Sequence, residues 1–242
     1  MPPVMTPPPD QTPAPTRRPT KEELREDALT TGAANALTFA NDNKGLLIGV
    51  AVAVVLGIAL LIGYGARQEG LDTEAATLLS RALVPYEAAE YENALDGTDG
   101  NPGLLAIADD YGSTDQGRLA AFYAGNALYE LDRMDEALEQ FRAYGAEESV
   151  IGASALAARA SIAEARGEYD DAAELYERAA EAYPTAAAAP EYLVGAARAY
   201  EADGDYAAAR GALETLRDEY GTSALANEAE VTLARLAVLA GQ

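Results

Sequence analysis

Cysteine, histidine and tryptophan are all absent from the chain. Without cysteine there can be no disulfide. The commonest nucleophile–base pairs of enzymes use cysteine or histidine, and so does nearly every zinc site. These absences exclude the most frequent kinds of catalytic and metal-binding centre.

Positive charge is also scarce. The chain contains two lysines, and the region after residue 65 holds 12 arginines against 34 acidic residues. The net charge of the whole chain is −23. A surface of this kind repels the phosphates of nucleic acids and anionic lipid headgroups. We therefore exclude nucleic acid as a partner of this region.

One long apolar segment, residues 45–65, stands out near the N-terminus. Its 21 residues carry no charge, and Tyr64 supplies the one polar group. About 20 apolar residues in a helix cross the hydrocarbon core of a bilayer. A cleaved signal peptide has a shorter apolar stretch near the chain start, whereas 44 residues precede this one. We predict a retained transmembrane helix over residues 45–65.

Small residues recur at four-residue spacing along this segment, at Gly45, Gly49, Ala53 and Gly57. Such a stripe permits close contact between membrane helices. Glycine and alanine are also frequent in membrane helices that have no partner. The stripe therefore indicates either helix–helix contact, including self-association into a homo-oligomer, or a membrane helix that has no partner.

The basic residues around the segment indicate its orientation. Five precede it, at Arg17, Arg18, Lys21, Arg25 and Lys44, and the first two after it are Arg67 and Arg81. Basic residues are retained on the cytoplasmic side of a membrane. The full count favours a cytoplasmic N-terminus, although the residues nearest the membrane balance at two on each side.

The N-terminal residues divide into two parts. Residues 1–19 are rich in proline, cannot build a core and are predicted to be disordered or polyproline-like. Residues 20–44 are predicted to be a partly helical juxtamembrane segment, because Thr20 and Glu23 fit a capping box. A helix lying on the membrane and a loosely helical linker both fit this composition.

Beyond the apolar segment, the chain is predicted to be helical throughout, because apolar residues recur at three- and four-residue spacings and no stretch alternates like a strand. One phrase occurs three times, at residues 131–138, 166–173 and 203–210. Its equivalent alanines, Ala137, Ala172 and Ala209, are separated by 35 and 37 residues. This is close to the 34-residue period of tetratricopeptide repeats.

The start of each phrase suits the end of the first helix in a hairpin. Gly167 and Gly204 occupy a position that favours positive φ, which glycine adopts freely. Asp132 takes the same place in the first copy, where a short polar side chain tolerates that conformation at some cost. The alanine of each phrase then falls where two antiparallel helices cross.

On these motifs the region resembles the tetratricopeptide repeat family over about residues 118–221. The resemblance implies an all-α fold, an α-solenoid of helix hairpins. Its predicted parts are a linker helix with a degenerate repeat over 66–117, three repeats over 118–222 and a capping helix over 223–242.

A short tail, one membrane span and a few repeats together resemble the ancillary SecYEG translocon subunit family of bacterial inner-membrane proteins. Residues 108–141 look like that family's repeat-bearing region. The resemblance implies a cytoplasmic N-terminus, repeats in the periplasm and a chaperone-like accessory role at the translocon. Its implied partners are unfolded or secretory chains, periplasmic chaperones and the translocon. The alternative is an envelope-assembly or cell-division scaffold with no translocon link.

In tetratricopeptide folds the first helix of each pair lines a concave groove. The residues predicted to face it are Leu119, Phe122, Asn126 and Tyr129 in the first repeat and Val194, Arg198 and Glu201 in the third. Aromatic rings beside an amide can grip an extended peptide. For any single ring, packing on the neighbouring repeat is the alternative explanation. Repeats that capture a terminal carboxylate use lysine and arginine there, so this acidic groove favours basic or unfolded apolar segments.

No recognisable catalytic constellation is present. The acidic pairs 147–148 and 170–171 suit solvated helix faces, and residues 96–101 fail the EF-hand pattern of alternating oxygen ligands. We predict a binding protein with no enzymatic activity, cofactor or metal. An enzyme with an unfamiliar acidic site is the remaining hypothesis, to be revived if no protein partner exists.

Overall fold

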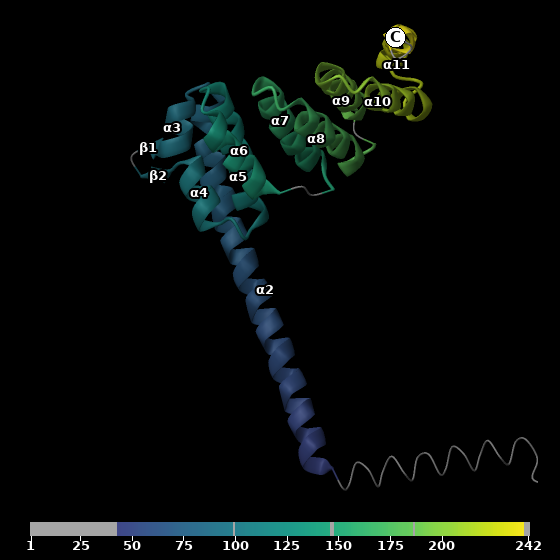
Figure 1. The fold of residues 1–242 in the computed structure, drawn as a ribbon. Helices are drawn as coiled ribbons and strands as arrows, with labels where there is room; N and C mark the ends of the chain where they lie inside the picture. Colours follow the sequence, from purple (N-terminus) through teal and green to yellow (C-terminus); the bar gives the residue numbers. More distant parts are fainter. Residues whose placement is uncertain (1–42, 99, 146–147, 186, 240–242) are drawn as a thin grey trace, which may run out of the picture. The chain divides into compact units, whose positions relative to one another are not determined.

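The computed structural model describes residues 43–98, 100–145, 148–185 and 187–239. The predictions for residues 1–19 and 20–42 lie outside this range. The helices are α2 (Lys44–Glu87), α3 (Tyr91–Asp96), α4 (Leu104–Asp110), α5 (Asp115–Glu130), α6 (Met134–Tyr144), α7 (Val150–Ala165), α8 (Tyr169–Ala182), α9 (Ala189–Asp203), α10 (Tyr206–Glu219) and α11 (Ala224–Leu239) (Figure 1). The prediction of an all-α fold built from helix hairpins is confirmed.

Residues 97–102 differ from the prediction that no strand occurs. Strands β1 (Gly97–Thr98) and β2 (Asn101–Pro102) form a two-residue antiparallel ladder. Gly97 and Gly100 have φ of 84° and 82°, a region that glycine enters without a steric penalty. These two glycines allow the chain to reverse here, and the ladder closes a short loop between α3 and α4.

The chain divides into two compact units, residues 1–63 and residues 64–242. In the first unit, the structure describes the apolar part of α2. Its large side chains are exposed, as Leu60 at 75% and Leu61 at 73% show. Within the described residues, α2 is the one helix long and apolar enough to cross a membrane, with a mean hydropathy of 3.0 over its most apolar 18 residues, none of them buried.

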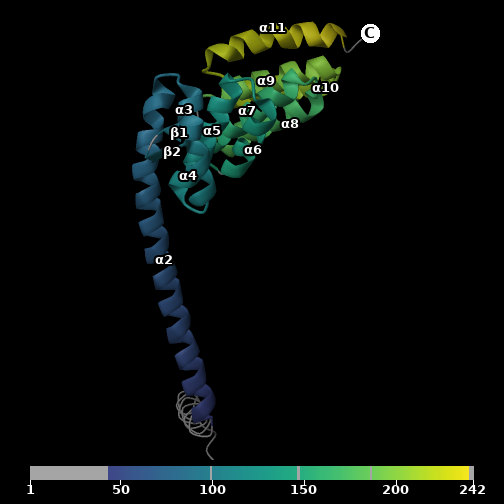
Figure 2. The ribbon, with the colours of Figure 1, turned by 90° about the vertical axis from the view of Figure 1, so that its left-hand side faces the viewer.

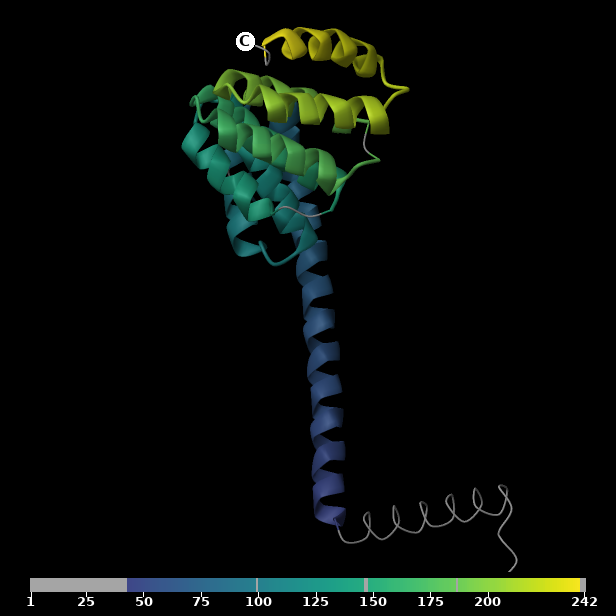
Figure 3. The same ribbon diagram turned by 45° about the vertical axis from the view of Figure 1, so that its right-hand side comes forward.

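The second unit consists of successive helix pairs. Helices α5–α6, α7–α8 and α9–α10 are antiparallel hairpins, and Figure 3 shows α7–α8 beside α9–α10. Helix α11 packs on α10 and α9 (Figure 2). Helices α3 and α4 pack on α5, and the C-terminal part of α2 joins their core through Leu79 and Ala82.

The three hairpin turns share one backbone geometry. Asp132, Gly167 and Gly204 have φ of 61°, 77° and 91°, as their place in the repeated phrase predicts. In each turn an N–H group reaches back five residues to a carbonyl. These bonds run from Arg133 to Leu128, from Glu168 to Ala163 and from Asp205 to Tyr200, at 2.9, 3.0 and 2.9 Å. The bond satisfies a carbonyl that the end of the helix leaves free.

Small residues lie where the helices of a hairpin cross. Ala137, Ala172 and Ala209 are completely buried, as the repeat pattern predicts. Gly125 on α5 faces the ring of Phe141 on α6, and a Cβ atom at position 125 would lie 2.8 Å from two of the ring carbons. Only glycine therefore fits at this crossing without moving the ring.

Candidate functional site

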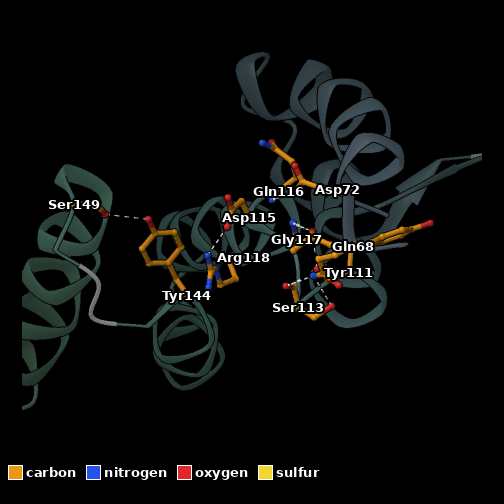
Figure 4. Close-up of polar contacts among 11 residues, drawn as sticks. Gln68, Asp72, Tyr111, Ser113, Asp115, Gln116, Gly117, Arg118, Tyr144 and Ser149 are labelled. Carbon is orange, nitrogen blue, oxygen red and sulfur yellow. Dashed lines mark hydrogen bonds and ion pairs between the residues drawn. The ribbon is translucent and has the colours of Figure 1, made fainter. Parts of the chain in front are cut away.

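Side chains of the C-terminal part of α2 form hydrogen bonds with the start of α5 and the residues just before it (Figure 4). Helix α5 carries four predicted groove residues. The Gln68 side-chain amide donates to the carbonyl of Ser113 at 2.5 Å. Asp72 accepts from the N–H of Gln116 at 3.0 Å, and Thr114 accepts from the N–H of Gly117 at 2.9 Å. The first N–H groups of a helix have no partner within the helix, and the helix dipole favours an acidic group beside them. Asp72 and Thr114 therefore cap α5 together.

The predicted groove residues on α5 are partly buried. Leu119, Phe122 and Tyr129 pack against the core cluster that contains Phe141. The Phe122 ring meets the Phe141 ring edge-on, with centroids 6.0 Å apart, and Asn126 donates to the carbonyl of Phe122 at 3.1 Å. Packing against the core thus engages Leu119, Phe122 and Tyr129, and a hydrogen bond within the helix engages Asn126. Their role in binding a peptide stays a prediction.

The structure brings the three predicted groove residues of the third repeat together. Val194, Arg198 and Glu201 line one hollow of about 210 Å³ between α9 and α11. Arg235 of α11 lines it as well. The hollow lies beside a core cluster different from that of the α5 set.

Ion pairs link the charged residues of this face from one hairpin to the next. Arg198 makes a two-pronged bond with Glu164, with nitrogen–oxygen distances of 2.8 and 2.7 Å. Arg235 pairs with Glu201 in the same way. Both pairs span 34 residues, which is one repeat period. The sequence pattern predicts Arg198 and Glu201 in the groove. Their ion pairs were not predicted, although opposite charges one repeat period apart indicate them.

The Glu164–Arg198 pair is expected to stabilise the fold by a measurable coupling energy. The bonded guanidinium of Arg198 lowers the pKa of Glu164 below its ordinary value of 4.5. Because the side chain of Arg198 is 58% exposed, we expect a coupling of about 0.5 kcal/mol, in the range of solvent-screened pairs. A group with a lowered pKa stabilises the fold above its unfolded pKa, and that contribution disappears as pH falls through the folded pKa.

Urea unfolding of wild type, Glu164→Gln, Arg198→Gln and the double variant at pH 7 and pH 3 checks this prediction. The coupling is expected at pH 7 and absent at pH 3. An equal coupling at both pH values would show that the carboxylate charge of Glu164 is not its source.

The small-residue stripe of the apolar segment is open. Among the described residues, a Cβ atom added at Gly45, Gly49 or Gly57 would meet nothing within 4 Å, and Ala53 is exposed. The stripe is thus free to receive another helix, and its role in helix contact stays a prediction. Among the described residues, no group of three or more acidic side chains could hold a metal ion.

Two of these hairpins match a known family of repeats. A tetratricopeptide repeat family model matches residues 155–186 and 191–223, which fall on α7–α8 and α9–α10. The chain contains tetratricopeptide repeats. Such repeats are protein–protein interaction modules that form extended concave surfaces, and no enzyme family is indicated.

A solved structure shares the tetratricopeptide fold. It is a crystal structure of nearly identical TPR-like repeats from a kinesin-light-chain candidate of Podosopora anserina. The match has a TM-score of 0.51 and 16% sequence identity, and it covers 71% of this chain and 89% of that chain. At this identity the likeness concerns the fold alone. No curated protein matches the chain.

Proposed function

We propose that the chain is a single-pass membrane protein whose tetratricopeptide repeats bind protein partners at the membrane. The observation that carries this proposal is the exposed apolar part of α2. Monomeric soluble proteins rarely leave so many contiguous large apolar side chains in water, whereas a bilayer covers them at no cost. The repeats then supply the partner-binding surface.

We further propose that the membrane is the bacterial inner membrane, with the N-terminus in the cytoplasm and the repeats in the periplasm. Five basic residues before the apolar segment support this orientation. The order of tail, span and repeats supports a chaperone-like accessory role at the secretion translocon, because the ancillary translocon subunits have that layout.

The partners we propose are unfolded or secretory chains and the translocon itself. A net charge of −23 favours basic or apolar segments and disfavours acidic ones. The open stripe at Gly45, Gly49, Ala53 and Gly57 supports contact with a translocon helix or with a second copy of the chain.

Paired reporter fusions at the C-terminus test the topology. Alkaline phosphatase is active outside the cytoplasm, and green fluorescent protein exported by the same route is dark. We expect an active phosphatase fusion and a dark fluorescent fusion. The reverse pattern would place the repeats in the cytoplasm and overturn the translocon role, leaving a generic scaffold.

Photocrosslinking in cells tests the partners. A photoreactive amino acid at Tyr129 or Val194 probes the groove, one at Gly49 probes the membrane stripe, and one at the exposed Arg217 on α10 serves as the control site. Mass spectrometry is expected to recover secretory chains and translocon subunits from the first three positions and not from the control. Recovery of envelope-assembly or division proteins instead would favour the alternative scaffold.

A further inference from the structure

A second hollow lies among α6, α7 and α8, and none of the predicted groove residues lines it. Its volume is about 260 Å³. Four arginines line it: Arg166 at the C-terminal end of α7, and three that come from different helices, Arg142 from α6, Arg159 from α7 and Arg178 from α8. This concentration of positive charge is unexpected in a chain with a net charge of −23.

These three arginines form no ion pair with a carboxylate among the described residues. Within the described part of the chain, seven of the twelve arginines after residue 65 form ion pairs. Three of the remaining five are Arg142, Arg159 and Arg178. Arg142, Arg159 and Arg178 thus have no ion-pair partner of their own, although three acidic residues line the same hollow.

Arg159 holds the most unfavourable position of the three. Its Nε–H group is buried and has no hydrogen-bond partner among the described residues. Burial, together with the neighbouring charges of Arg178 and Arg142, lowers the pKa of Arg159. A buried donor without an acceptor, close to two like charges, is a costly arrangement. An anion in the hollow would supply the missing acceptor and the missing charge.

Acidic residues in the hollow limit which anions it can bind. Glu168, Asp171 and Glu174 also line the hollow, and Arg166 beside them is already paired with Asp135 at 2.5 Å. A small anion that touches the guanidinium groups gains charge-assisted hydrogen bonds, and these oppose the repulsion from the three carboxylates. A long polyanion would also meet the acidic surface outside the hollow.

We propose that Arg142, Arg159 and Arg178 form a binding site for a small oxyanion of the phosphate class. The fork of N–H donors on a guanidinium fits phosphate oxygens in pairs. A phosphate monoester carries about two negative charges near pH 7 and offers three acceptor oxygens, so several arginines can share it. A carboxylate has one charge, which a single arginine satisfies. The source is inorganic phosphate or the phosphate group of a small metabolite, and this site is independent of the proposed translocon role.

Isothermal titration of the full-length protein in detergent tests the site. Inorganic phosphate, O-phosphoserine and acetate are titrated at pH 7.5 and constant ionic strength. We expect one phosphate-class anion to bind, at least tenfold more tightly than acetate. The tighter of inorganic phosphate and O-phosphoserine identifies the source. Equal binding of acetate, or no heat beyond that of sodium chloride, would overturn the proposal.

Variants locate the binding. Arg159→Gln and Arg178→Gln are each expected to weaken phosphate binding at least tenfold. If Arg159→Gln fails to fold, Arg142→Gln replaces it, because Arg142 is exposed, and it is also expected to weaken phosphate binding. Its circular dichroism spectrum checks that it folds. Arg217→Gln removes the same charge from an exposed arginine outside the hollow and is expected to leave binding unchanged. Equal affinity in all four variants would refute the assignment.

Discussion

Replacing Phe141 with alanine is expected to lower the free energy of unfolding by about 3–5 kcal/mol, the usual cost of removing a buried phenylalanine ring. Phe141 is 1% exposed and is among the largest fully buried side chains of the described residues. Its ring, on α6, packs against α5 at the crossing of the two helices, where it meets Gly125 and the Phe122 ring. Because α5 and α6 also contact each other elsewhere along the hairpin, the cavity left behind is not expected to collapse fully.

Urea unfolding followed by circular dichroism measures this loss. Tyr183→Ala is the control, because Tyr183 is 37% exposed and its removal is expected to change the free energy of unfolding by less than about 0.5 kcal/mol. Similar losses in both variants would show that ring burial at the α5–α6 crossing does not stabilise the unit.

Gly125 supplies an internal check on the same crossing. Gly125→Ala in the wild type is expected to cost about 1–3 kcal/mol through overpacking against Phe141. In the Phe141→Ala background the clash disappears, and alanine then gains about 1 kcal/mol over glycine as a helix former. The sign of the Gly125→Ala effect is thus expected to reverse, and a cost that persists would assign it to another neighbour.

The turns and crossings were predictable because their determinants are local. Each turn needs a residue with positive φ, which is Asp132, Gly167 or Gly204, and each crossing needs a small residue five positions later. Both features lie within eight residues of sequence. Repetition at 35 and 37 residues then identifies the hairpin as the structural unit. The short β1–β2 ladder was not predictable in this way, since two residues per strand are too few to alternate.

The candidate sites were less predictable because they depend on how one hairpin stacks on the next. Position in the repeat placed Phe122 on the groove side of α5, yet its ring also reaches Phe141, and only packing decides how much of it stays exposed. Arg142, Arg159 and Arg178 come from three different helices, and no local sequence pattern predicts that they line one hollow. Arg142 and Arg178 are 36 residues apart, so the repeat period alone would have aligned two of the three.

Two arginines placed at the middle of the apolar segment are expected to prevent its insertion into the membrane. Each arginine at the centre of a transmembrane helix costs about 2.5–3.5 kcal/mol, so Val54→Arg with Val55→Arg opposes insertion by about 5–7 kcal/mol. Both valines are exposed, at 54% and 64%, so neither change disturbs a protein core. The protein is expected to move from the carbonate-resistant membrane fraction to the soluble fraction.

Val150→Arg with Val231→Arg is the matched control, because these valines are also exposed, at 52% and 73%, but lie in the repeat-bearing unit. It adds the same charge and is expected to leave the protein in the membrane fraction. If the Val54/Val55 variant resisted carbonate as the wild type does, the apolar segment would not be the anchor. Because the repeats occupy their own compact unit, their fold is expected to survive the loss of insertion, so circular dichroism separates release from unfolding. A released but folded repeat unit would show that lipid acts on this chain by localising a binding surface that proteins recognise in water.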